Sequence, residues 1–167
     1  QQIDAVSQEM TERFQAHGIS MRPVFHKRAE AAVHQGRIAQ ARALWDEAMR
    51  HPRDRWADCA ACEASFEIEL LLRENRFQDL IAAAQPILSG ETRCTEVPHS
   101  VLPDIMLAQS DLEQADEVAK IRPESYRLVG RSPNFVEEVA LHIELQVARG
   151  DLAEAARIAT RHMPWLR

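Results

Sequence analysis

The chain has 167 residues, of which 46% are hydrophobic and 5% aromatic, and its formal charge is −6. This length is enough for one domain with a hydrophobic core, whereas five glycines are too few for the many tight turns of a β-sandwich or barrel. No segment approaches the roughly 18 apolar residues of a membrane span, and no signal-peptide pattern opens the chain. We therefore expect an all-α, cytoplasmic protein without membrane contact. Because it begins at Gln1 and not at methionine, the chain is compatible with a piece of a longer protein.

Charge is spread unevenly along the chain. Residues 21–56 carry eight Lys and Arg against four Asp and Glu, whereas residues 57–167 carry eleven against nineteen. On a helical protein such asymmetry is typical of solvated faces, although it can also guide the approach of a charged partner. Residues 50–55 are basic but lack interleaved aromatic residues and belong to an acidic protein, which argues against nucleic acid as the partner.

In chain order, the first predicted element is a helix over about 3–17, which ends at Gly18. After it come four segments that share a turn-forming residue, then a charged residue, then an apolar one. Their first residues lie 39, 35 and 40 positions apart and are Gly36, Asn75, Ser110 and Gly150. Apolar residues at three- and four-residue spacing flank these segments, so we expect one helix to end and the next to begin at each.

Four antiparallel helix pairs follow from these turns, with boundaries at about 22–56, 57–95, 96–132 and 133–167. The whole chain, 1–167, is then predicted to be a single helical-repeat domain. Pro86 and Pro103 fall where helix is expected, so a kink or a late helix start is predicted at each. The alternative is a bundle of amphipathic helices with a chance similarity at the turns, which leaves the class all-α.

The first pair places Ala41, Trp45 and Ala48 at successive helix contacts and follows them with Pro52. This pattern resembles the tetratricopeptide repeat, and the resemblance covers roughly residues 22–165. It implies a right-handed solenoid of antiparallel helix pairs that holds partner proteins in a concave groove. The chain departs from the family in having a longer period and in lacking the early Trp and Leu-Gly signals.

Three cysteines and one histidine form the chemically specialised feature of the sequence. Cys59 and Cys62 make a Cys-x2-Cys, and a long gap separates it from the Cys-x4-His of Cys94 and His99. Four soft ligands suit a closed tetrahedral zinc site. Because the second helix of a pair returns antiparallel, the linker after it lies beside the start of the first helix. The pattern therefore predicts a structural Zn²⁺ site at one end of the second helix pair.

Three other interpretations of the cysteines stay open. They can be small buried hydrophobic residues, or two of them can form a disulfide, which a reducing compartment disfavours. A redox Cys-x-x-Cys is the third, although such pairs follow a strand and none is predicted. Together with the closing segment 161–165, the cysteine pattern also resembles a group of uncharacterised bacterial tetratricopeptide proteins, which implies no particular activity.

No enzyme motif is present. His142 and Glu144 form a His-x-Glu, but the Cys-x-x-Cys of zinc deaminases follows that motif, and here it lies far upstream of it. The nucleophile, phosphate-loop and dinucleotide motifs are absent as well. We therefore expect a protein that is not an enzyme, with a zinc- or cysteine-dependent enzyme and a ligand-sensing regulatory domain as alternatives.

The resemblance to tetratricopeptide repeats implies that the first helix of each pair faces the groove. The groove-facing candidates are His26, Glu30, Ser65, Glu69, Arg73, Ser100, Asp104 and Glu144. Carboxylates dominate this set, so the expected partner is a protein or peptide segment of basic or polar character, held by charge-assisted hydrogen bonds. Each position is equally compatible with an ordinary solvated helix face.

Overall fold

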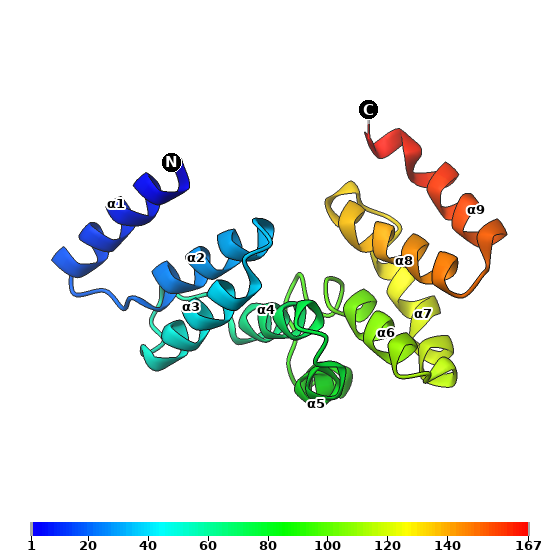
Figure 1. The fold of residues 1–167 in the computed structure, drawn as a ribbon, viewed down its shortest axis with the longest axis horizontal. Coiled ribbons are helices and arrows are strands. Elements are labelled where there is room, and N and C mark those ends of the chain that lie inside the picture. The colour runs from blue at the N-terminus through cyan, green and yellow to red at the C-terminus, as the bar shows by residue number, and fades with distance from the viewer. Residues whose placement is uncertain (1, 167) are drawn as a thin grey trace. The chain divides into compact units, whose positions relative to one another are not determined.

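The computed structural model describes the backbone of residues 2–166 and all of their side chains except those of Gln2 and Asp4. Within the described residues there are nine α-helices and no strand (Figure 1), which confirms the all-α class. The sequence predicted one domain over 1–167; the structure divides the chain into two compact units, 1–59 and 60–167.

The first unit holds three helices: α1 (Gln2–Ala16), α2 (Arg22–His34) and α3 (Ile38–Arg50). Helices α2 and α3 pack side by side (Figure 1), and the residues at their contact are mostly small. Ala29, Ala32, Ala41 and Ala48 have no exposed surface, because two helices whose facing residues are alanines can approach closely. Trp45, which is 4% exposed, is the largest buried apolar side chain among those described in this unit.

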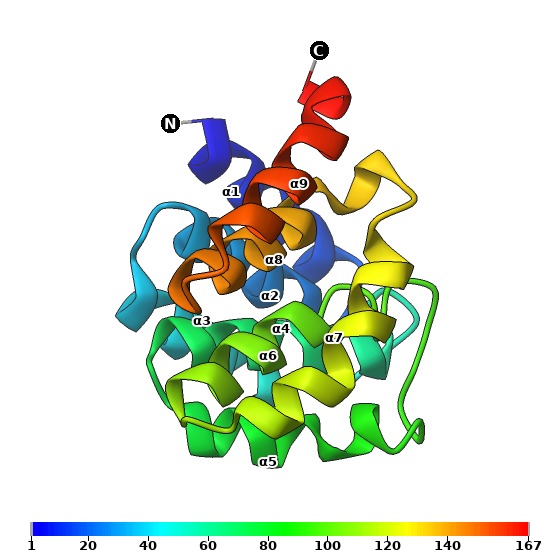
Figure 2. The same cartoon turned by 90° about the vertical axis from the view of Figure 1, so that its right-hand side faces the viewer.

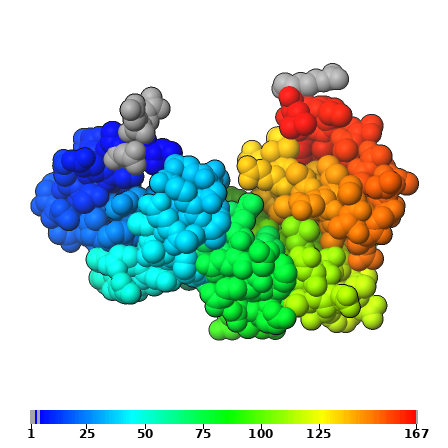
Figure 3. Space-filling model, viewed as in Figure 1, coloured from blue at the N-terminus to red at the C-terminus, as the bar shows by residue number. Residues whose placement is uncertain are grey.

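The second unit holds six helices and two short 3-10 segments. Their bounds are α4 (Ala60–Arg73), α5 (Phe77–Leu88), α6 (Leu102–Asp111), α7 (Ala115–Val129), η1 (Pro133–Phe135), α8 (Val136–Ala148), α9 (Leu152–His162) and η2 (Met163–Leu166). Helices that follow one another across a short turn pack together as pairs. Figures 1 and 2 both show α8 beside α9, and the space-filling view shows side chains closing the space between them (Figure 3).

The largest apolar cluster of the second unit joins α4, α5 and α6. Ile68, Leu80 and Ile105 lie fully buried at its centre. Val97 and Val101, in the loop between α5 and α6, are also fully buried in this cluster. The loop is therefore fixed to the core at two points, which holds the residues before and between those valines in place.

The same turn joins the two helices of each pair. In every case one residue has a positive φ, and the four are Gly36 (70°), Asn75 (56°), Glu113 (57°) and Gly150 (77°). The N–H of that residue bonds to the carbonyl three residues back, and the next N–H bonds to the carbonyl five residues back. This is the hydrogen-bond pattern that closes many helices. The four residues lie 39, 38 and 37 positions apart (36 to 75, 75 to 113, 113 to 150).

The third turn is not where the sequence placed it. Ser110 was expected at the turn but lies in the last turn of α6, and the left-handed residue is Glu113. The buried face of α6 explains the shift. Gln109 is 4% exposed and stands four residues before Glu113, as the buried Leu71 stands before Asn75. Burial of that face fixes where the helix ends, although glutamate disfavours a positive φ.

Proline positions agree in part with expectation. Pro103 lies in the first turn of α6, where a missing N–H costs nothing, so this helix starts late, at Leu102. Pro86 lies inside α5, which ends two residues later at Leu88, and Pro123 lies inside α7. None of the described helices combines the length and the hydrophobicity that a membrane crossing requires.

Candidate functional site

The cysteines occupy the positions that the sequence predicted for them. Cys62 lies in the first turn of α4, and Cys94 lies in the loop between α5 and α6. The N–H of Cys94 donates to the carbonyl of Val97 at 3.0 Å, so the buried valine holds the cysteine loop closed. Cys59 precedes Cys62 by one helical turn, so the local backbone sets the distance between them.

The three sulfur atoms lie within 4.8 Å of one another. The Sγ atoms of Cys62 and Cys94 are 3.6 Å apart, and none of the three cysteines is in a disulfide among the described residues. Two thiolates bound to one tetrahedral zinc at about 2.3 Å lie roughly 3.8 Å apart. The spacing of this sulfur pair is therefore close to that of zinc ligands and well beyond the length of about 2.05 Å of a disulfide bond.

The structure does not bring His99 into the cysteine group. Its ring instead stacks on Phe135, with ring centroids 5.2 Å apart and planes 10° from parallel. His99 Nδ1 is buried and has no hydrogen-bond partner in the described part of the chain. Apolar stacking thus competes with metal ligation for this side chain, and sequence spacing alone could not show that competition.

Two of the predicted groove residues lie in the first unit. His26 is 2% exposed, so it is a buried residue of α2 and not an accessible one. Its Nδ1 lies 3.2 Å from Asp58 and its Nε2 lies 3.4 Å from Glu30, while its ring tilts against Trp45. Lys27 Nζ also contacts both carboxylates, at 2.8 Å and 2.9 Å. Together with His26 these carboxylates have the spacing of metal ligands, but the lysine already supplies them with a cation.

Four predicted groove residues of the second unit form two contacts. Ser65 Oγ on α4 lies 3.3 Å from Ser100 Oγ in the loop before α6. One turn further along α4, the guanidinium of Arg73 lies 3.6 Å from Glu69. The structure therefore brings α4 and the start of α6 together. Glu144, on α8, is exposed and makes no ion pair within the described residues.

Asp104 is the most unusual of the predicted groove residues. It lies in the first turn of α6 and is only 8% exposed, yet its carboxyl takes part in no hydrogen bond or ion pair within the described part of the chain. Burial, together with the charges of Glu69 on α4 and Glu138 on α8, raises the pKa of Asp104 to about 7, while the nearby Arg73 acts in the opposite direction. A buried carboxyl without a partner is rare in proteins.

Glu138 belongs to the same acidic site, which we define as Glu69, Asp104 and Glu138. In the sequence, Glu137 and Glu138 look like an ordinary pair of exposed carboxylates, and nothing marks Glu138 as a site residue. In the structure it is half-buried on α8, and burial is the main reason that its pKa lies above the usual value, with Glu137, Glu96 and Glu69 acting in the same direction. Carboxylates on three helices therefore lie close enough for the charge of one to raise the pKa of another.

A buried polar network lies elsewhere in the second unit. Ser125 Oγ and His142 Nε2 are 2.9 Å apart, and both residues are fully buried. Tyr126 Oη lies 3.0 Å from His162 Nε2. His162, at the end of α9, is 5% exposed and packs against Trp165. With Ser125 closed off from solvent, the Ser–His pair has the features of a structural contact.

Burial also sets the charge state of this network. It lowers the pKa of His142 to about 4, with a smaller effect from Arg122. His142 is therefore neutral near pH 7, which suits a ring that shares a hydrogen bond with a hydroxyl. The polar residues of this network join α7, α8 and α9 beside an apolar cluster that includes Val129, Val139 and Ile158.

Comparisons with models of protein families, with curated proteins and with solved structures found no match to this chain.

Proposed function

We propose that the protein is a binding module of the helical-repeat kind, whose acidic site holds a basic side chain of a partner protein or peptide. The four turns share one geometry and recur at nearly equal intervals along the chain (36 to 75, 75 to 113, 113 to 150), which supports a solenoid of tetratricopeptide type. Stacked helix pairs of this type offer extended surfaces for partners. The recurrent turn supports the architecture, and the acidic site supports the function.

Asp104 is the observation that carries the proposal. Its carboxyl is almost buried, its pKa is raised by the charges of two further carboxylates, and it has no hydrogen-bond or ion-pair partner among the described residues. The carboxyl oxygens of Asp104 are not completely enclosed by the protein, so they keep some contact with the surface. A lysine or arginine side chain that reached it would supply the missing partner and offset the repulsion from Glu69 and Glu138.

A peptide array tests this function. We expect the full chain to bind hexapeptides with a central Arg or Lys and to leave the matched peptides with Glu at that place unbound. Asp104→Asn should weaken binding of the best peptide about tenfold or more, because a charged hydrogen-bond partner is lost. Asp111→Asn is the matched control, since Asp111 lies on the same helix but is exposed. Equal affinities of the two variants would place the binding surface elsewhere.

We further propose that the cysteine group holds a structural zinc ion. The spacing of 3.6 Å between Cys62 and Cys94 supports this interpretation, as does the tight loop that presents Cys94. Three thiolates would hold the ion, and the fourth position would be taken by water or by His99 after its ring leaves Phe135. The ion would tie the loop between α5 and α6 to the start of α4, so its release should destabilise the second unit.

Elemental analysis of protein purified without a histidine tag tests the zinc proposal. We expect close to one zinc per chain, and less than about 0.2 would contradict a tight structural site. Cys94→Ser should lose the metal, whereas His99→Ala should keep most of it, because His99 lies outside the cysteine group. A Cys62–Cys94 disulfide found in protein kept under reducing conditions would also overturn the proposal.

A further inference from the structure

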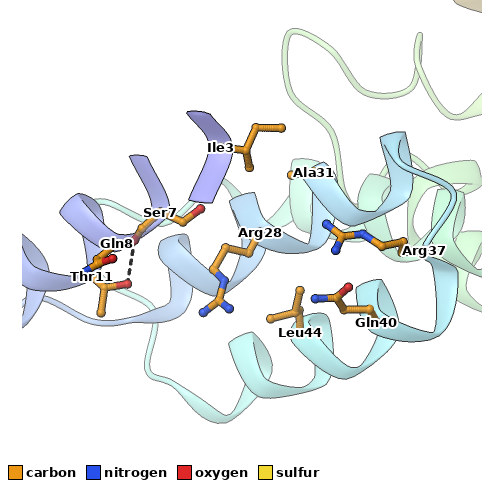
Figure 4. A pocket seen from close by; sticks show the side chains of 9 residues that line it. All are labelled: Ile3, Ser7, Gln8, Thr11, Arg28, Ala31, Arg37, Gln40 and Leu44. Atoms are coloured by element: carbon orange, nitrogen blue, oxygen red, sulfur yellow. Dashed lines mark hydrogen bonds between the residues drawn. The ribbon is translucent and has the colours of Figure 1, made fainter. Parts of the chain in front are cut away.

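A pocket of about 230 Å³ opens in the first unit. Three helices line it, and each contributes residues from one face. The lining residues are Ile3, Ser7, Gln8 and Thr11 on α1, Arg28 and Ala31 on α2, and Arg37, Gln40 and Leu44 on α3. Figure 4 shows them around one space, with the α1 residues on one side and the α3 residues on the other. Convergence of three helices distinguishes this pocket from a surface groove along one helix.

The pocket is cationic. Arg28 and Arg37 both line it, and no carboxylate is among its described lining residues. Neither guanidinium makes an ion pair or a hydrogen bond within the described part of the chain; Arg28 only lies over the ring of Phe25, at 5.8 Å. Other arginines of the same unit do pair with carboxylates, as Arg13 does with Glu9 and Arg50 with Glu47.

Uncharged hydrogen-bond groups accompany the two arginines. The hydroxyl of Ser7 and the amide of Gln40 make no side-chain hydrogen bond among the described residues, so both are available to a ligand. Arg37, Gln40 and Leu44 belong to the first two turns of α3 or directly precede them. This is the positive end of the helix dipole, which favours an anion nearby.

We propose that this pocket binds a small organic oxyanion, with its carboxylate or phosphate group held by Arg28 and Arg37. Guanidinium groups recognise both kinds of oxyanion through paired hydrogen bonds. Ile3, Ala31 and Leu44 add an apolar edge that suits a short carbon body. The volume of about 230 Å³ is below the range of roughly 300 to 1,000 Å³ that is typical of sites for drug-sized ligands, so the ligand is small. This site is separate from the acidic site, which lies wholly in the second unit.

Calorimetric titration of the full chain with sodium phosphate and with succinate tests the proposal, at an ionic strength held constant with sodium chloride. We expect saturable binding of at least one probe, and the preferred probe identifies the oxyanion as phosphate or carboxylate. Arg28→Gln and Arg37→Gln should each weaken binding about tenfold to a hundredfold, as the loss of a charge-assisted hydrogen bond does. Arg28→Lys should weaken it less than Arg28→Gln, because the charge remains but the paired geometry is lost.

Arg50→Gln is the control, since Arg50 is also exposed but pairs with Glu47 outside the pocket. All three positions are exposed, so we expect unchanged helical circular dichroism in every variant. The proposal is overturned if neither probe binds more tightly than about 10 mM, or if Arg28→Gln and Arg37→Gln bind as well as Arg50→Gln does.

Discussion

Replacing Asp104 by asparagine should stabilise the protein at neutral and alkaline pH. The carboxyl is 8% exposed and has no hydrogen-bond or ion-pair partner in the described chain, and burial followed by the charge of Glu69 raises its pKa from 3.8 to about 7. The folded state therefore binds a proton more tightly than the unfolded state. Below about pH 4, Asp104 is protonated in both states and does not change the free energy of unfolding. As the pH rises toward and through 7, its ionisation lowers the free energy of unfolding.

The size of the effect follows from the two pKa values. The difference between 3.8 and about 7, at about 1.4 kcal/mol for each tenfold change, corresponds to roughly 4 kcal/mol at most. Asparagine has a similar shape and no charge, so the variant should escape this penalty. We expect Asp104→Asn to exceed the wild type in free energy of unfolding by a few kcal/mol at pH 8, and the difference to vanish near pH 4.

Urea unfolding followed by circular dichroism, at intervals between pH 4.5 and 8.5, measures this difference. Titrating groups that are not coupled to Asp104, unlike Glu69 and Glu138, contribute equally to both proteins and cancel in the comparison. Asp111→Asn controls for the removal of one negative charge, and its stability should follow that of the wild type at every pH. Parallel curves for the wild type and Asp104→Asn would refute the reasoning, because they would show that Asp104 ionises normally in the folded state.

Two further predictions concern the second unit. Burial lowers the pKa of His142 from 6.5 to about 4, so the unfolded chain binds more protons between these values and stability should fall by about 3 kcal/mol as the pH drops from 6.5 to 4; thermal melts of His142→Gln should show a smaller loss over that range. Glu113→Gly should raise the melting temperature, because Glu113 has a φ of 57° and glycine removes a strain of about 1 kcal/mol. Ser110→Gly should lower the melting temperature, because Ser110 is helical and glycine there costs a similar free energy. The opposite ranking of these two variants would place the third turn back at Ser110.

Three of the four turns could be predicted from sequence because glycine and asparagine mark a left-handed residue by their chemistry. Gly36, Asn75 and Gly150 all adopt positive φ values. Glu113 carries no such signal, and its conformation follows from burial of α6 against its neighbours. A local pattern cannot report a constraint that tertiary packing imposes.

The candidate sites show a similar division. The approach of Cys62 and Cys94 could be predicted, because two linkers of one antiparallel pair must meet at the same end. The stacking of His99 on Phe135 could not, since it depends on a residue far along the chain. The sequence could not show that Asp104, Arg28 and Arg37 lack ion-pair partners among the described residues. In a sequence with many charges of both signs, any charged residue could have a partner of opposite sign in the fold.

Proton release on binding tests the proposed acidic site most directly. The best peptide of the array is titrated at pH 6.5 in buffers that differ in their enthalpy of ionisation, which counts the protons exchanged. Before the peptide binds, Asp104 has a pKa of about 7 and therefore holds roughly three quarters of a proton at this pH. A cationic side chain beside it should lower that pKa. We expect the wild type to release up to about that amount and Asp104→Asn to release none. Binding without proton release, or equal release by both proteins, would contradict it.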